Sequence, residues 1–185
     1  EEPNPIIPLW TIVDNGPTVF EFEDKTYEPN NYGEKFYGPV TLRQALTKSL
    51  NVATVKLAEM TGLPKIAALA KQAGMNEKLM ATPALALGAY EVTPLEIAGA
   101  YTIFANAGVR TEPLFVRSVR DSKGSSIERA EPKLKPVLDP RTAYLMTGLM
   151  ESVINRGTGA RARGLGFNLP AAGKTGTSHD GWFAG

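Results

Sequence analysis

Several residue types are missing or scarce in this chain of 185 residues, and each absence excludes a class of functional site. The chain has no cysteine, which excludes disulfide scaffolds, thiolate metal sites and cysteine nucleophiles. It has a single histidine, His179, so a Ser-His-Asp triad would need that residue as its base. A metal site built from two or more histidines is excluded for the same reason.

Net charge and long apolar runs are also nearly absent. The 20 Lys and Arg residues almost balance the 19 Asp and Glu residues, which leaves a formal charge of +1. Such a balance argues against a protein that binds nucleic acid mainly through its phosphates. No apolar run approaches the roughly 18–20 residues of a membrane-spanning helix, and the first residues lack the pattern of a signal peptide. The hydrophobic content of 43% instead indicates a globular domain.

The residues that are present predict a mixed α+β chain with many loops. Glycine (18) and proline (14) are abundant and lie mostly outside the helical patterns. Two capping boxes, Thr41 with Gln44 and Thr93 with Glu96, predict the starts of two helices. Short strands are expected at 10–13 and 18–22 around a turn at 14–17, at 114–119 and 126–128, and in a hairpin at 171–178 and 181–185. Helices are expected at 41–47, 52–60, 64–73, 93–107 and 139–154, the last with a buried stripe of Leu145, Met146, Leu149, Met150 and Val153.

Two short motifs could support chemistry. The first is a Ser-Leu-Asn triplet at 49–51, where Ser and Asn weaken helix interiors and predict a break between two helices. The second is a Lys-Thr-Gly-Thr run at 174–177, inside an expected strand. Taken singly, each motif has an ordinary explanation, because Ser-x-Asn commonly serves as a cap or turn and Lys-Thr-Gly as a solvated strand edge.

Together, the two motifs resemble the second and third motifs of the penicillin-recognising serine transpeptidases, whose first motif, Ser-x-x-Lys, supplies the nucleophile. The segments at 27–32 and 38–43 are similar to the approach to the second motif in class A penicillin-binding proteins, the bifunctional enzymes of cell-wall synthesis. The runs at 156–159 and 182–185 are similar to the C-terminal stretch of that class. These segments occur in the family order across almost the whole chain.

One departure from the family pattern changes what is expected of this chain. No serine is followed by lysine three residues later, and the family's nucleophile lies upstream of a segment like 10–22. We therefore expect residues 1–185 to be an interior fragment of a single transpeptidase domain, truncated at both ends and inactive alone. The resemblance implies a β-lactamase/transpeptidase-like α+β fold, with an antiparallel sheet flanked by helices and a mostly helical region that contributes the Ser-x-Asn loop.

The resemblance also implies catalytic roles for four residues. Ser49 would relay a proton to the leaving amine, and Asn51 would bind an amide of the substrate. Lys174 would supply positive potential beside the carboxylate of the substrate. The backbone N–H of Thr177 would be one of the two donors that stabilise the oxyanion, the other belonging to the missing serine.

Three further residues would bind substrate. The hydroxyls of Thr175 and Thr177 would bond to the carboxylate, and Gly176 would let the backbone approach the ligand closely. Trp182 would rim the cleft, whereas His179 is expected at an exposed hairpin tip. An edge strand suits this task because its unpaired N–H and C=O groups can bind an extended peptide.

The implied ligands are peptidoglycan stem peptides that end in D-Ala-D-Ala, together with β-lactam antibiotics. The resemblance implies no metal and no organic cofactor, and nucleic acid is not an expected partner. It implies a place in the bacterial cell envelope, at the outer (periplasmic) face of the cytoplasmic membrane. The membrane anchor would belong to a segment that these residues do not include.

Three alternatives remain open at this point. A non-catalytic module that binds or senses penicillins would keep the two motifs without turnover. A β-lactamase or D-Ala carboxypeptidase would share the motifs but not the segments at 27–43. A P-loop nucleotide-binding protein is suggested by Gly173-Lys174-Thr175, but its pattern needs a glycine where Asn168 stands and a helix after the motif.

Overall fold

The computed structural model describes residues 7–177 and 181–185. The expected hairpin tip at His179 lies outside the described residues. Strands and helices occur in separate runs along the chain rather than in strict βαβ alternation, which is typical of an α+β protein. The helices are α1 (Leu42–Lys48), α2 (Asn51–Thr61), α3 (Leu63–Gln72), α4 (Pro94–Ala105), α5 (Pro140–Arg156) and α6 (Arg161–Gly164), with 3-10 helices η1 (Tyr32–Glu34) and η2 (Pro83–Leu87). The strands are β1 (Ile12–Asp14), β2 (Phe20–Phe22), β3 (Lys25–Tyr27), β4 (Pro39–Thr41), β5 (Val109–Thr111), β6 (Ser118–Arg120), β7 (Ser126–Arg129), β8 (Leu134–Pro136), β9 (Lys174–Thr177) and β10 (Gly181–Ala184).

The strands pair in antiparallel twos, which confirms the α+β class. Within the described residues the pairs are β1–β4, β2–β3, β5–β8, β6–β7 and β9–β10, and no pair is joined to another by a ladder. The predicted hairpin at the C-terminal end is therefore present as β9–β10. The turn at 14–17 does not join paired strands, however, because β1 pairs with β4 and β2 with β3.

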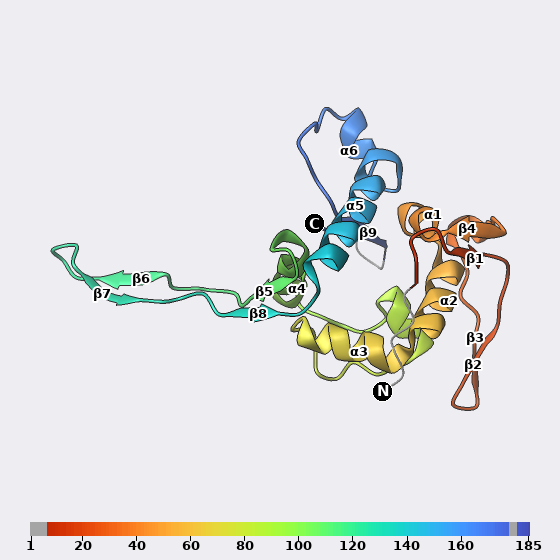
Figure 1. Ribbon diagram of the computed structural model, residues 1–185, viewed down its shortest axis with the longest axis horizontal. Coiled ribbons are helices and arrows are strands. Elements are labelled where there is room, and N and C mark those ends of the chain that lie inside the picture. The colour runs from red at the N-terminus through yellow and green to blue at the C-terminus, as the bar shows by residue number, and fades with distance from the viewer. Residues whose placement is uncertain (1–6, 178–180) are drawn as a thin grey trace.

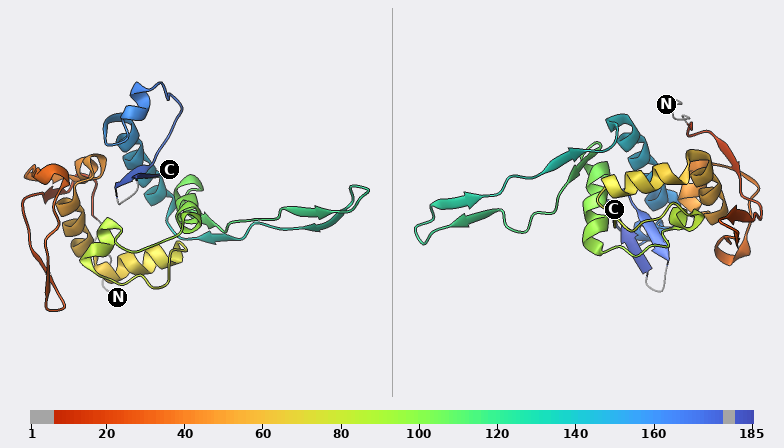
Figure 2. Two further views of the ribbon diagram at one scale, coloured as in Figure 1. Left: turned by 180° about the vertical axis from the view of Figure 1, so that it is seen from behind. Right: turned by 90° about the horizontal axis from the view of Figure 1, so that it is seen from below.

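The molecule consists of a helical body and one long projection (Figure 1). The projection comprises β5 to β8, residues 109–136, and is called the arm below. It leaves the body beside α4 and returns to the beginning of α5, and it extends outward in all three ribbon views (Figures 1 and 2). In the body, α1, α2, α5, β9 and β10 form what we call the site region.

Buried hydrophobic side chains form one part of the core in the site region and a second part outside it, around Ala100 and Ile103 of α4. Val52 and Val55 of α2 and Val153 of α5 have no exposed surface. A separate cluster of Val13, Val40, Leu42, Ala45, Leu50 and Ala53 joins β1, β4, α1 and the start of α2. The stripe expected on α5 is only partly right, because Leu145 is 48% exposed. Buried residues gather in the second half of α5, which lies against α1, and the first half contributes only Ala143.

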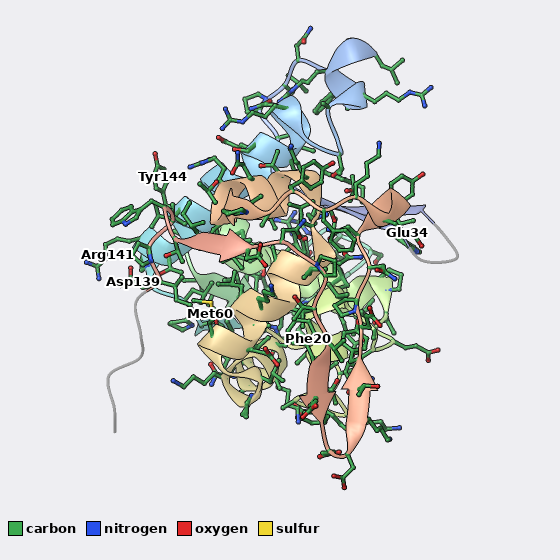
Figure 3. All side chains as sticks on the ribbon, turned by 90° about the vertical axis from the view of Figure 1, so that its right-hand side faces the viewer. Phe20, Glu34, Met60, Asp139, Arg141 and Tyr144 are labelled. Atoms are coloured by element: carbon green, nitrogen blue, oxygen red, sulfur yellow. The ribbon has the colours of Figure 1, made fainter. Side chains whose placement is uncertain are left out.

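Side-chain caps mark the beginnings of α1, α4 and α5. Both predicted capping boxes are present, with the Thr41 and Thr93 hydroxyls accepting from the N–H groups of Gln44 and Glu96. Asp139 caps α5 and forms a salt bridge with Arg141, which holds the pKa of the Asp139 carboxyl at about 2. These two side chains lie together at the exposed beginning of α5 in Figure 3. Among the described helices, none has both the length and the apolar character needed to cross a bilayer.

Candidate active site

Ser49 lies at the tight junction between α1 and α2. Its backbone is left-handed, with φ 55° and ψ 52°, and its N–H donates to the carbonyl of Leu46. The N–H of Leu50 then donates to the Ala45 carbonyl at 2.9 Å, and α2 begins at the next residue. A left-handed conformation is uncommon outside glycine and marks positions where the surroundings hold the backbone. The predicted break at 49–51 is therefore present, and its geometry presents Ser49 between two helices.

Asparagines from the N-terminal loops hold the beginning of α2. The side-chain oxygen of Asn31 accepts from the N–H of Val52, and that of Asn15 accepts from the N–H of Ala53, both at 3.3 Å. Asn51 itself donates from its amide nitrogen to the carbonyl of Asn30 at 2.7 Å. This contact leaves the side-chain oxygen of Asn51 as the group that could meet a ligand. Sequence patterns missed Asn15 and Asn31, because each resembled an ordinary turn residue.

Lys174 begins strand β9, as predicted for the Lys-Thr-Gly-Thr run. Close packing against β10 holds the residue just before β9. A Cβ added at Gly173 would overlap the Phe183 ring and the Ala184 carbonyl of β10. The Gly173 N–H also reaches the Met150 carbonyl of α5 at 3.5 Å. A strand follows Lys174 where a P-loop would begin a helix, which argues against the nucleotide-binding alternative.

The two motifs meet although 125 residues separate Ser49 from Lys174. The Lys174 ammonium donates to Ser49 Oγ at 2.8 Å and to the Thr175 carbonyl at 2.8 Å. Within the described part of the chain, no carboxylate forms a salt bridge with Lys174. Burial lowers the pKa of the Lys174 side chain, because desolvation disfavours its charged form. A partly buried cation without an anionic partner is suited to binding an anionic ligand.

Thr158 extends this group of side chains. Its hydroxyl lies 2.6 Å from that of Thr175, and its N–H donates to the Thr47 carbonyl, two residues before Ser49, at 3.2 Å. The run at 156–159 begins with Arg156, the last residue of α5, and continues with Gly157, its C-cap. A Cβ at Gly157 would overlap the Thr47 carbonyl, so glycine allows α1 and α5 to approach closely here. No local sequence pattern marks Thr158, because its partners are distant in the chain.

The other predicted site residues lie on the exposed part of the hairpin. Trp182 is opposite Gly176 in the ladder and is 58% exposed, and Thr177 is exposed and opposite Gly181. A Cβ at Gly176 would meet only ordinary contacts with Trp182, at 3.8 Å. The described fold therefore does not itself require glycine at 176, whereas it does require Gly173.

The arrangement can bind an anion and pass a proton. Lys174 has three N–H donors and no acceptor, so Ser49 Oγ must accept from it and keeps its own proton available to donate. An ammonium cannot act as a base, so Ser49 is not activated as a nucleophile by Lys174 in this charge state. Among the described residues, no cluster of three or more potential metal ligands occurs.

Comparison with known proteins agrees with this geometry. Residues 13–181 match the family model of the penicillin binding protein transpeptidase domain. The chain is 32% identical to penicillin-binding protein 1A of Pseudomonas aeruginosa, over 95% of this chain and 28% of that protein. It is 38% identical to penicillin-binding protein 1A of Aquifex aeolicus, over 85% of this chain and 22% of that protein. The chain thus spans about a quarter of the length of these relatives.

Solved structures show the same fold. The crystal structure of penicillin-binding protein 1A from Haemophilus influenzae superposes with a TM-score of 0.88 at 24% identity, covering 96% of this chain and 33% of that one. The D,D-transpeptidase domain of a peptidoglycan glycosyltransferase from Eggerthella lenta gives a TM-score of 0.75 at 26% identity, covering 96% of this chain and 51% of that one. The expected fold and class A relationship are therefore confirmed, and the chain belongs to the penicillin-binding protein transpeptidase domain family.

Proposed function

We propose that this chain is part of a D,D-transpeptidase that cross-links peptidoglycan stem peptides ending in D-Ala-D-Ala, and that β-lactams bind at the same site. The observation that supports the proposal is the contact between Lys174 and Ser49, with the Thr175 hydroxyl beside it and no carboxylate paired with the ammonium in the described residues. A peptide with a free C-terminal carboxylate supplies the missing anion.

The reaction needs two displacement steps at one carbonyl. A serine oxygen attacks the carbonyl carbon of the penultimate D-Ala as its proton passes to an adjacent base. The C–N bond then breaks, and the terminal D-Ala leaves as an amine that takes a proton. The amine of a second stem peptide then attacks the acyl-enzyme, forms the new amide bond and releases the serine. No serine of this chain has a lysine three residues later, so we propose that the nucleophile belongs to a Ser-x-x-Lys segment outside residues 1–185.

The residues of this chain would bind the substrate and move the proton. Ser49 would donate its hydroxyl proton to the leaving amine, while Lys174 holds its oxygen and balances the charge of the carboxylate. The Thr175 and Thr177 hydroxyls would bond to that carboxylate, and the Thr177 N–H would donate to the oxyanion. Asn51 would accept a hydrogen bond from a substrate amide through its free oxygen.

The relatives also support a proposed location. Penicillin-binding proteins 1A of several bacteria match this chain, and the substrate proposed here is found outside the cytoplasm. We therefore place the protein at the periplasmic face of the bacterial cytoplasmic membrane, held by an anchor outside these residues.

Intact-mass spectrometry after incubation with a labelled penicillin tests the proposal. Residues 1–185 alone should gain no covalent adduct, and a longer chain with the Ser-x-x-Lys segment should gain one per molecule. In the longer chain, Lys174→Ala should slow labelling at least tenfold, whereas Lys123→Ala in the arm should leave the rate unchanged. Stoichiometric labelling of residues 1–185 at Ser49 would show that the nucleophile has been assigned wrongly.

The lack of a Ser-x-x-Lys pair in this sequence also favours a second candidate, a non-catalytic module that recognises penicillins. Such a module would bind penicillin reversibly, and the longer chain would remain unlabelled. A hydrolase of the same fold would be labelled but would release the product to water rather than to an added amine, which a product assay distinguishes.

A further inference from the structure

The hydroxyl of Thr158, which lies against that of Thr175, has no role in the function proposed so far. Their oxygens are 2.6 Å apart, which is a short O–H···O hydrogen bond, and either atom could be the donor. The two residues come from different elements, the segment after α5 and strand β9. Which hydroxyl donates determines where the remaining proton points.

Counting donors and acceptors settles the direction once an anion is bound. Each hydroxyl has one proton and two acceptor positions, whereas an ammonium only donates. Lys174 Nζ lies 3.5 Å from Thr175 Oγ1, so it can fill one acceptor position there. If the Thr158 hydroxyl donates to the second acceptor position of Thr175 Oγ1, the Thr175 hydroxyl proton must point away from both Lys174 and Thr158. A carboxylate is acceptor-only, so its arrival selects this arrangement over the reverse one.

The backbone of Thr158 is held firmly enough to impose that direction. Its N–H is bonded to the Thr47 carbonyl, and the glycines on both sides are packed so closely that a Cβ would crowd α1 at Gly157 and Ile154 at Gly159. Thr158 therefore has a fixed position relative to Thr47, and through it to Ser49 two residues later. A residue whose backbone is fixed in this way loses little further entropy when its side chain bonds to a neighbour.

We propose that Thr158 is a positioning residue that donates to Thr175, so that the Thr175 hydroxyl proton points at the carboxylate of the ligand. Thr158 thereby makes the site selective for ligands with a free carboxylate over the same ligands with a neutral end. The inference rests on the proposed function, because it assumes that a carboxylate binds beside Lys174. It adds a residue that acts through Thr175 and does not itself touch the ligand.

Binding of a matched pair of probes tests the inference. The probes are an acetylated peptide ending in D-Ala-D-Ala and the same peptide with a C-terminal carboxamide. Each is titrated by calorimetry into the longer chain with the serine of its Ser-x-x-Lys segment replaced by alanine, so that neither probe is cleaved. Thr158→Val removes the hydroxyl at constant shape and should reduce the ratio of acid to amide affinity about three- to tenfold, the range expected for one hydrogen bond. Thr158→Ser keeps the hydroxyl and should keep most of the ratio.

Two results would overturn the inference in distinguishable ways. If the unsubstituted protein prefers the acid and Thr158→Val keeps the same preference, Thr158 does not direct Thr175. If the unsubstituted protein itself does not prefer the acid, the carboxylate site of the proposed function is wrong and the inference falls with it. In a Thr175→Val background, Thr158→Val should change the ratio no further, whereas a purely structural effect of Thr158 would persist.

Discussion

The site region and the arm contain similar kinds of residues but use them differently. Val52, Val55 and Val153 in the site region are fully buried, whereas Val116, Val119 and Ile127 in the arm are all more than 40% exposed. None of residues 109–136, all of which the structure describes, is buried. The strands of the arm pair only with one another, as β5–β8 and β6–β7, whereas the buried cluster at α1 and α2 joins segments distant in sequence. The candidate site therefore lies where segments distant in sequence converge.

Glycines show the same contrast. In the site region, Gly157 and Gly173 leave space that neighbouring backbone occupies. In the arm, Gly124 has open space around it and is needed only for the turn, where φ is +83°. A glycine in the site region thus brings helices and strands together, whereas this one in the arm only reverses the chain.

The largest expected difference between the two regions is the free energy of unfolding that is lost when one isoleucine is shortened to alanine. Ile154 is 3% exposed in α5, and Ile127 is 68% exposed in β7. Ile154→Ala should lower the free energy of unfolding by about 2–5 kcal/mol, since it removes buried methyl groups and leaves a cavity. Ile127→Ala should change it by less than about 0.5 kcal/mol. Urea denaturation of both variants measures the difference, and equal losses would show that the arm packs as tightly as the body.

A pair of glycines in and just after α5 tests close packing at the site. Gly157→Ala places a methyl group against the Thr47 carbonyl and should lower the free energy of unfolding by about 1–3 kcal/mol. Gly148→Ala meets nothing within 4 Å inside the helix and should raise it by about 0.5–1 kcal/mol. Thermal denaturation of the two variants gives opposite shifts. A neutral Gly157→Ala would mean that α1 and α5 are not held in contact here.

Local signals in the sequence predicted much of the body. The capping boxes at Thr41 and Thr93, the break at Ser49 and the strand at Lys174 all depend on residues within a few positions of one another. Each of these features is present in the structure. Short-range hydrogen bonding is sufficient to specify them.

Features that depend on distant partners could not be predicted in the same way. The proximity of Ser49 to Lys174 followed from a family resemblance, because no spacing rule links residues 125 positions apart. Thr158 and Asn15 received no role, since what distinguishes them is a partner on another element. The exposure of Leu145 was missed for a related reason: helical periodicity identifies an apolar face but not how far along the helix a neighbour extends.

The pH dependence of affinity for a carboxylate peptide tests whether Lys174 binds the anion at the candidate site. Burial lowers the pKa of Lys174, so its ammonium should lose its proton at a lower pH than an exposed lysine, whose pKa is about 10.4. Affinity for a carboxylate peptide should therefore fall about tenfold as the pH rises through that lowered pKa, because only the charged form attracts the carboxylate. Lys174→Arg stays charged throughout and should remove the fall. An unchanged affinity up to pH 10 in the original protein would argue against Lys174 as the anion-binding group.

The smallest expected effect distinguishes unfolding of the whole chain from local opening of the arm. Thr41 caps α1 in the site region, and the Asp121 carboxylate accepts from the N–H groups of Lys123 and Ser125 at the tip of the arm. Thr41→Ala should lower the free energy of unfolding by about 1 kcal/mol, because α1 packs on α5 and cannot fray without loosening the core. Asp121→Ala should leave that free energy unchanged, since the arm can open by itself. It should instead speed amide hydrogen exchange at residues 118–129 only. Faster exchange in α1 or α5 of the Asp121 variant would show that the arm and the site region unfold as one unit.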